Sequence, residues 1–197
     1  MKVFRTYTDP ALIALLREGG VGVLPTDTLY GLVASAYHPQ AVERLYTLKR
    51  RERKPGTTIA GSVQQLADLG IAPEVLARVT HLWPNPISVI LPLPDSLAYI
   101  HQGRGDSPFR VVADPVLQAL LGQTGPLVTS SANHPGEPPA TSVGEARAYF
   151  GDHVDFYVDG GDLGHRPPST IIKLQDNDEI AVIREGAILI DKQGNSI

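Results

Sequence analysis

Residues 21–28 read VGVLPTDT, an apolar run closed by a polar one. The run VGVLP at 21–25 is short and apolar throughout, which predicts a strand buried within a sheet. Thr26, Asp27 and Thr28 follow at once, so their side chains are expected at the carboxyl end of that strand, where open α/β sheets place their ligands. The stretch therefore predicts an α/β sheet with a candidate site at this edge. For Asp27, three roles stay open: a turn residue, a helix cap or a ligand to magnesium.

Helices are predicted on both sides of this strand. Thr8-Asp9-Pro10 offers a side-chain cap and a first-turn proline for a helix that ends at the glycines of 19–20. An apolar stripe through 41–50 predicts a second helix, which runs into the basic segment KRRERKP at 49–55. Capping boxes and prolines predict further helices from Ser62, from Pro73 to about Leu82, from near Pro115, and from Ser142 through Tyr149.

Short strands are predicted along the rest of the chain. They are ISVILPLP (87–94), residues 110–112, PLVT (126–129), FYV (156–158), STIIKL (169–174), IAVI (180–183) and AILI (187–190). Helices and strands interleave at first, whereas the last third is nearly all strand. We therefore predict a single α/β domain over residues 1–197, with a twisted mixed sheet flanked by helices.

The amino-acid composition and the net charge exclude several classes of protein. The 197 residues are 42% hydrophobic, enough for one buried core, and the absence of cysteine excludes disulfides and thiolate-based metal sites. The first apolar stretch, 11–16, is closed by Arg17 and Glu18, so neither a signal peptide nor a membrane span is expected, and the protein is predicted to be cytoplasmic without membrane contact. A net charge of −4 argues against a protein that coats nucleic acid through general positive charge.

The sequence lacks the usual motifs of several common nucleotide-binding, zinc-binding and hydrolytic sites. No glycine-rich loop ends in GK[ST], and GRGDSP at 103–108 fails the dinucleotide fingerprint because Pro108 stands at its last glycine. The sequence has no HExxH motif and no histidine pair at helical spacing, so no zinc site is predicted. Neither GxSxG nor SxxK occurs around Ser130 or Ser131. A nucleophilic serine enzyme is therefore disfavoured.

Two polar constellations remain. Four positively charged side chains stand at the end of a predicted helix: Lys49, Arg51, Arg53 and Lys54. They suit either a solvated helix terminus, where positive charge complements the helix dipole, or a binding site for a polyphosphate. TSSAN at 129–133 follows a strand and offers hydroxyls, an amide and backbone N–H groups, which suits either a satisfied turn or the lining of a polar substrate site. For each segment, the residues alone do not decide between the structural role and the binding role.

Seven blocks, in this order, resemble the YrdC family and cover nearly the whole chain. They are PTDTLYGL (25–32), KRRERKP (49–55), WPNPISVIL (83–91), FRVVADP (109–115), TSSANHPGEPPAT (129–141), DGGDLGHRPPST (159–170) and VIREG (182–186). The resemblance is to the short, single-domain form, without the C-terminal domain of longer members. It implies a threonylcarbamoyl-AMP synthase, a nucleotidyltransferase that makes threonylcarbamoyl-AMP and pyrophosphate from L-threonine, bicarbonate and ATP.

The resemblance also assigns residues by motif. Threonine would be bound by Thr28, Arg110, Ser131 and Ser169, and the nucleotide by Arg51, Lys54, Asn133, Thr141 and Arg184. Lys49, Arg51, Ser131 and Asn133 match the KxR and SxN signature and are predicted to be catalytic. Mg²⁺ would arrive with ATP and bridge its phosphates, with no metal site built by the protein. A tRNA threonylcarbamoyl transferase complex is the implied downstream partner, and direct contact with tRNA is left open.

Some segments depart from the family pattern. The KRRERKP loop is one residue shorter than usual, and WPNPIS and RVVADP replace WPGPLT and RVP, which leaves the amino-acid preference open. Two alternatives compete with the synthase: a divergent YrdC-like paralogue that binds RNA or a nucleotide without making the adenylate, and a carbamoyl-transfer enzyme that uses carbamoyl phosphate. The second ranks last, because the larger proteins of that kind carry zinc-finger and acylphosphatase-like segments absent here.

Overall fold

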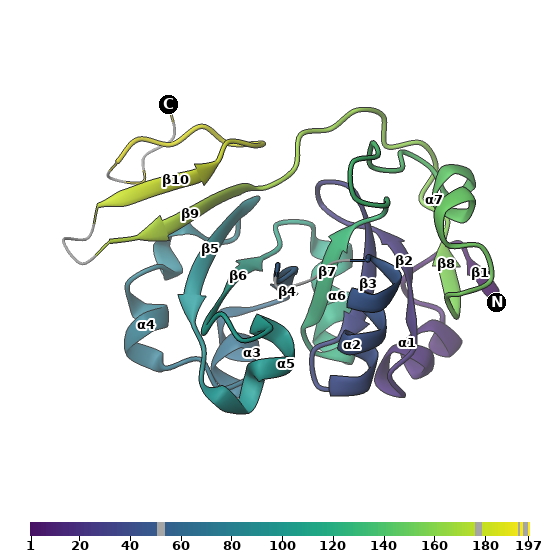
Figure 1. Cartoon of the computed structure of the whole chain (residues 1–197), viewed down its shortest axis with the longest axis horizontal. Helices are drawn as coiled ribbons and strands as arrows, with labels where there is room; N and C mark the ends of the chain where they lie inside the picture. The colour runs from purple at the N-terminus through teal and green to yellow at the C-terminus, as the bar shows by residue number, and fades with distance from the viewer. Residues whose placement is uncertain (51–53, 176–178, 193, 195–196) are drawn as a thin grey trace.

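The computed structural model describes residues 1–50, 54–175, 179–192, 194 and 197. Within them, one ten-stranded sheet has the order β1-β8-β2-β3-β7-β4-β6-β5-β9-β10 (Figure 1). Its strands are β1 (Lys2–Phe4), β2 (Val21–Pro25), β3 (Tyr30–Ser35), β4 (Thr57–Ala60), β5 (Ile87–Pro92), β6 (Asp106–Val111), β7 (Leu127–Ser131), β8 (Phe156–Val158), β9 (Thr170–Leu174) and β10 (Ile180–Arg184).

Parallel and antiparallel pairs alternate irregularly across the sheet. β8 lies parallel to both β1 and β2, β4 is parallel to β6, and β5 is parallel to β9. The remaining neighbours are antiparallel, including β2 with β3 and β3 with β7. The predicted α/β fold with a mixed sheet flanked by helices is confirmed.

Helices cover both faces of the sheet. α1 and α6 contact each other and share one apolar cluster with the sheet, in which Leu12 and Leu16 lie near Leu117 and Leu121. α2, α7 and the shorter helices contribute to the other cluster, for example through Leu45 and Phe150. The helices are α1 (Pro10–Arg17), α2 (Pro39–Leu48), α3 (Val63–Asp68), α4 (Pro73–Ala77), α5 (Ala98–His101), α6 (Pro115–Thr124) and α7 (Val143–Phe150). No helix in the described part of the chain is long and apolar enough to cross a membrane.

Side-chain caps begin the helices where the sequence predicts them. The Asp9 carboxylate accepts a hydrogen bond from the backbone N–H of Ala11, with Pro10 in the first turn, and Ser62 and Ser142 cap α3 and α7. The reciprocal half of the predicted capping box differs at Glu145, whose carboxylate accepts from the N–H of Thr141, one residue before the cap. The box is therefore shifted outward by one residue.

Three sequence predictions are wrong in detail. The helix expected from Pro73 to about Leu82 ends at Ala77 and is followed by a 3₁₀ turn over Thr80–Leu82. The strand expected over 110–112 is longer, Asp106–Val111, and excludes Val112. AILI at 187–190 forms no strand apart from an isolated bridge at Ile190. The backbone N–H and carbonyl of Ile188 bond to the side chain of Thr170, and the carbonyl of Leu189 accepts from the N–H of Ile197, so these groups do not pair along a neighbouring strand.

The strand β3 lies where the sequence analysis placed only a polar motif. YGLVAS at 30–35 follows TDT directly and returns antiparallel to β2, with Val23 opposite Leu32 and Pro25 opposite Tyr30. TDT is thus the turn of a hairpin, and its side chains lie at the carboxyl end of β2 as predicted.

The segment 159–169 between β8 and β9 crosses from one end of the sheet toward the other (Figure 1). Tyr30 anchors its beginning: the phenol donates a hydrogen bond to the carbonyl of Gly161 and accepts one from the N–H of Gly160. The N–H of Thr170 donates to the carbonyl of Pro86 at its far end. We call residues 159–169 the crossing segment, and it brings Ser169 to the candidate site.

Candidate active site

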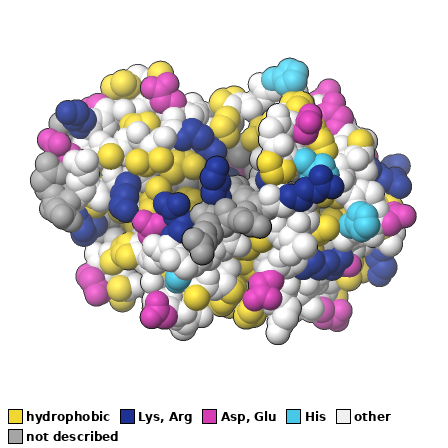
Figure 2. Space-filling model, viewed as in Figure 1, with side chains coloured by type: hydrophobic (Ala, Val, Ile, Leu, Met, Phe, Trp, Pro, Cys, Tyr) yellow, Lys and Arg dark blue, Asp and Glu magenta, His cyan; other side chains and the backbone are white. Residues whose placement is uncertain are grey.

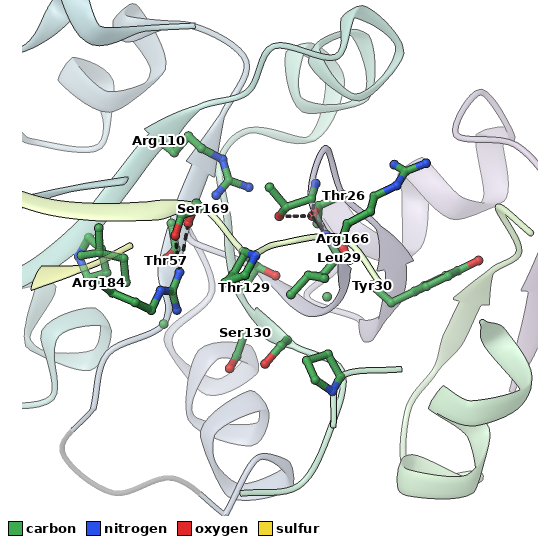
Figure 3. A pocket seen from close by; sticks show the side chains of 18 of the residues that line it. Thr26, Leu29, Tyr30, Thr57, Arg110, Thr129, Ser130, Arg166, Ser169 and Arg184 are labelled. Atoms are coloured by element: carbon green, nitrogen blue, oxygen red, sulfur yellow. Dashed lines mark hydrogen bonds between the residues drawn. The ribbon is translucent and has the colours of Figure 1, made fainter. Parts of the chain in front are cut away.

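A pocket of about 370 Å³ opens where the hairpin turn, the start of β4, the end of β7 and the crossing segment meet. Its size is that of a small-ligand site. Figure 3 shows the side chains of Thr26, Arg110, Thr129 and Ser169 around this space. The residues that line it are Thr26, Thr28, Leu29, Tyr30, Gly31, Pro55, Gly56, Thr57, Pro108, Arg110, Thr129, Ser130, Ser131, Pro139, Arg166, Pro168, Ser169, Ile171 and Arg184.

Residues assigned from five separate motifs meet in this pocket. Thr28, Arg110, Ser131, Ser169 and Arg184 all contribute to its lining, although they span more than 150 positions of the sequence. Figure 2 shows Lys and Arg side chains gathered near the middle of this face of the molecule. The fold therefore joins the two polar strand ends of the sequence analysis to the later motifs.

A buried ion pair holds Arg110 in the wall of the pocket. The Arg110 Nη2 atom lies 2.6 Å from Asp27 Oδ1, and the two side chains are only 3% and 7% exposed. Asp27 is thus a residue of the hairpin turn, and one of its two carboxylate oxygens is engaged by Arg110. The Arg110 Nε and Asp27 Oδ2 atoms are buried without a hydrogen-bond partner among the described residues.

Burial and pairing act on Arg110 in opposite directions. Desolvation lowers the pKa of the guanidinium, whereas the charge of Asp27 and its hydrogen bond raise it. A guanidinium remains protonated in proteins at neutral pH, so Arg110 keeps its positive charge beside Asp27. The positive charge that Arg110 can offer a carboxylate ligand is therefore already partly compensated.

Two threonines of the hairpin turn make a compact hydroxyl pair. Thr26 Oγ1 lies 3.2 Å from Thr28 Oγ1 and donates to the carbonyl of Leu29 at 2.7 Å. Gly31 allows β7 to approach this turn: a Cβ at Gly31 would overlap Thr129 Oγ1 and lie 3.2 Å from the Thr26 methyl carbon. Both Thr26 and Thr28 line the pocket.

Lys49 and Asn133 form a network beside the pocket, outside its lining. The buried ammonium donates to the carbonyls of Ser131 and Asn133, both at 2.6 Å, and to Asn133 Oδ1 at 2.5 Å. Asn133 Nδ2 in turn donates to the carbonyl of Glu137 at 2.6 Å. Three short bonds match the three donors of an ammonium. These signature residues therefore fix the shape of the loop after β7, which presents Ser131 to the pocket.

Ser169 and Arg184 lie together at the other end of the pocket. Arg184 Nη2 donates to the Ser169 carbonyl at 2.5 Å and to its hydroxyl at 3.3 Å. The arginine follows a bulge in β10, between Val182 and Arg184, which shifts its register against β9. The VIREG motif is thus tied to the crossing segment.

Thr141 and Lys54, both assigned to the nucleotide, lie near the pocket but outside its lining. Thr141 lines an adjoining cavity of about 320 Å³ that shares Leu29, Pro139 and Arg166 with the pocket. Lys54 is exposed and precedes Pro55 and Gly56, which line the pocket. Arg51 lies outside the described residues, so its predicted role has no structural counterpart here.

Tyr30, Arg166 and Ser88 were missed by sequence reasoning. Tyr30 and Arg166 belong to the motifs PTDTLYGL and DGGDLGHRPPST, so their place in these motifs could have indicated that they line the pocket. Ser88 is buried under the pocket, bonded to both Arg110 and Ser169, and no local pattern in WPNPIS marks it. Among the described residues, no three His, Asp or Glu side chains are grouped to hold a metal ion.

Gly186 holds the VIREG loop against the crossing segment. The N–H of Ala187 donates to the carbonyl of Pro168 at 2.8 Å, and a Cβ at Gly186 would lie 2.5 Å from the carbonyl carbon of Ser169 and 2.6 Å from the N atom of Thr170. These are backbone atoms, so a side chain there cannot be accommodated by a rotamer change.

We expect Gly186→Ala to lower the free energy of unfolding by about 1–3 kcal/mol, because overpacking forces the backbone apart. Urea unfolding measures it. The control Gly144→Ala lies in α7, where the nearest atom to the added Cβ is 3.7 Å away. It should stabilise the protein by about 0.5–1 kcal/mol. Equal unfolding free energies for the two variants would show that the Gly186 contact does not matter.

Comparison with known proteins adds the family. The family model for Sua5, YciO and YrdC, described as telomere recombination, matches residues 14–186. The chain belongs to the Sua5/YciO/YrdC family. Among curated relatives of the family, the threonylcarbamoyl-AMP synthase of Coxiella burnetii is 37% identical over 162 residues, which cover 79% of this chain and 87% of the relative.

Solved structures of the Sua5/YciO/YrdC family show the same fold. P. abyssi Sua5 complexed with L-threonine superposes with a TM-score of 0.82 at 25% identity, covering 95% of this chain and 58% of Sua5. The chain thus spans somewhat less than two thirds of that protein's length. E. coli YciO superposes with a TM-score of 0.77 at 26% identity, covering 94% of this chain and 96% of YciO.

Proposed function

We propose that the chain is an L-threonylcarbamoyladenylate synthase. The observation that carries this proposal is the meeting of Thr28, Arg110, Ser131, Ser169 and Arg184 in one pocket. The name of the C. burnetii relative and the threonine complex of Sua5 support it. A downstream transferase would then move the threonylcarbamoyl group to a tRNA adenosine.

The proposed reaction joins two substrates at one phosphorus. The threonine amine and bicarbonate form a carbamate with loss of water. A carbamate oxygen then forms a bond to the α-phosphorus of ATP, and the bond from that phosphorus to the bridging oxygen breaks, so pyrophosphate leaves. No protein nucleophile is needed, and the rate gain comes from positioning and from charge stabilisation.

The pocket residues suit these steps. Arg110 offers hydrogen-bond donors to the threonine carboxylate, and the Thr28 hydroxyl can partner the threonine side chain. Arg184, together with Lys54 and the motif-assigned Arg51, would meet the nucleotide phosphates. Mg²⁺ would come with the phosphates of ATP and help to neutralise the charge that gathers on the departing pyrophosphate.

A pyrophosphate assay tests the proposal. The protein is incubated with ATP, Mg²⁺, bicarbonate and L-threonine, and released pyrophosphate is measured with each component omitted in turn. Release should require all four. Release that does not depend on threonine, from protein shown to be folded by circular dichroism, would refute the synthase.

One observation favours a second candidate, a YrdC-like protein that binds RNA or a nucleotide without making the adenylate. The ammonium of Lys49 and the amide of Asn133 are engaged with the loop after β7, and neither residue lines the pocket. Salt-sensitive RNA binding in a gel-shift titration, together with a silent pyrophosphate assay, would favour this candidate.

Thr28→Val separates threonine binding from nucleotide binding. Valine keeps the β-branched shape and removes the hydroxyl, so we expect the KM for threonine to rise about tenfold, the equivalent of one lost hydrogen bond. The KM for ATP should stay unchanged. Initial rates of pyrophosphate release at varied threonine and varied ATP measure both constants, and an equal rise in the two would contradict the assignment of Thr28 to threonine.

A further inference from the structure

A buried serine links two of the pocket residues assigned to threonine, Arg110 and Ser169. Ser88 lies on β5 between β6, which carries Arg110, and β9, which Ser169 precedes. Its side chain is fully buried and does not line the pocket. Ser88 Oγ accepts a hydrogen bond from Arg110 Nη1 at 3.4 Å and lies 2.9 Å from Ser169 Oγ.

The hydrogen-bond inventory of these two hydroxyls sets the direction of the bond between them. A serine hydroxyl has one hydrogen to donate and two lone pairs to accept with. Arg110 can only donate, so the single hydrogen of Ser88 finds its acceptor in Ser169 Oγ. If Ser169 donated instead, the Ser88 hydrogen would be buried without a partner, which costs about 1–3 kcal/mol.

The hydroxyl hydrogen of Ser169 then has no acceptor in either Ser88 or Arg184. Its oxygen accepts from Ser88 and from Arg184 Nη2, at 2.9 and 3.3 Å, which uses both lone pairs. Its own hydrogen is therefore directed away from both partners. Ser169 lines the pocket, so the pocket is where that hydrogen can find an acceptor.

We propose that Ser88 is a positioning residue, which orients the Ser169 hydroxyl as a hydrogen-bond donor to an oxygen of the amino-acid substrate. The inference rests on the proposed function and deepens it, because it gives Ser169 a defined role as donor. The acceptor is a carboxylate oxygen of the amino acid, which also brings that carboxylate toward the guanidinium of Arg110. The series Arg110, Ser88 and Ser169 thus acts as one polarised chain, in which each bond strengthens the next.

Three variants test the role of Ser88. In Ser88→Ala, Ser169 is free to turn its hydrogen away from the ligand, and kcat/KM for threonine should fall about tenfold with the KM for ATP unchanged. Ser88→Thr keeps a hydroxyl and should restore most of the loss. Ser35→Ala is the matched control, since Ser35 is also buried in a strand but accepts only from the N–H of Tyr37 among the described hydrogen bonds, outside the pocket. It should leave kcat/KM unchanged.

A double-mutant cycle with Ser169→Ala separates positioning from a general loss of stability. If Ser88 acts through Ser169, adding Ser88→Ala to Ser169→Ala should change kcat/KM for threonine by less than about twofold, since coupled residues are not additive. Full additivity of the two effects would overturn the inference, as would a Ser88→Ala variant as active as Ser35→Ala. A wild-type protein without threonine-dependent pyrophosphate release would instead contradict the proposed function and this inference with it.

Discussion

Arg110→Met is expected to destabilise the protein by about 3–5 kcal/mol, because it leaves the Asp27 carboxylate buried without its cation. The two side chains are 3% and 7% exposed, so water cannot replace the lost partner without opening the wall of the pocket. Urea unfolding followed by circular dichroism gives the free energy, provided that the slope of the transition stays the same in the variant. Threonine-dependent activity should be lost as well.

The double variant Asp27→Leu/Arg110→Met tests whether the unpaired charge of Asp27 causes this loss of stability. With both charges gone, most of the lost stability should return, since an apolar pair of similar size is often as stable as a buried ion pair. Activity should not return with it. Arg104→Met is the matched control, because its side chain is 56% exposed and lies 3.9 Å from Asp106. A double variant less stable than Arg110→Met alone would show that the pair is not the source of the effect.

Lys49→Met is expected to destabilise the protein by about 1–3 kcal/mol, because it leaves the carbonyl of Asn133 without the ammonium donor, and a buried acceptor left unpaired costs about that much. The Ser131 carbonyl and Asn133 Oδ1 also lose their bonds to the ammonium, but they keep bonds from the N–H of Asn133 and the hydroxyl of Ser131. The loop after β7 would lose the contacts that hold Ser131 and Asn133. Pyrophosphate release should therefore fall together with stability. Thermal or urea unfolding and the pyrophosphate assay measure the two effects on the same preparation.

Lys2→Met is the control for this change, since Lys2 is exposed at the edge strand β1 and should leave the free energy of unfolding within about 0.5 kcal/mol of the wild type. If Lys49→Met lost activity but kept wild-type stability, Lys49 would act on the substrate alone. Its buried network would then contribute little to the fold.

The sequence predicted the core elements that have local signals. VGVLP, the capped helix from Pro10 and the strand ISVILP follow apolar periods, caps and prolines, and these depend on neighbouring residues only. β3 was missed because YGLVAS begins inside a motif read for its polar residues. AILI was overpredicted because its β-branched, apolar composition suits a strand, whereas in the structure the backbone of Ile188 hydrogen-bonds to the Thr170 side chain instead of to the backbone of a neighbouring strand.

The site was predictable where motifs reach the pocket and hidden where the contact joins distant strands. Thr28, Arg110 and Ser169 lie in the lining as the motif assignments suggest. The pairing of Asp27 with Arg110 joins residues 83 positions apart, and Ser88 reaches Ser169 across 81. Such partners depend on strand order in a mixed sheet, which no local pattern encodes. Lys49 shows the converse, since its motif predicted a ligand contact and its geometry adds a structural role.

In the proposed reaction, this pocket joins threonine, bicarbonate and ATP. Its most direct test is mass spectrometry of the product formed with bicarbonate labelled with heavy carbon. We predict a threonylcarbamoyl-AMP ion one mass unit heavier than the product made from ordinary bicarbonate, formed only when threonine is present. Pyrophosphate release with no labelled threonylcarbamoyl-AMP, in a reaction quenched within seconds, would contradict the account.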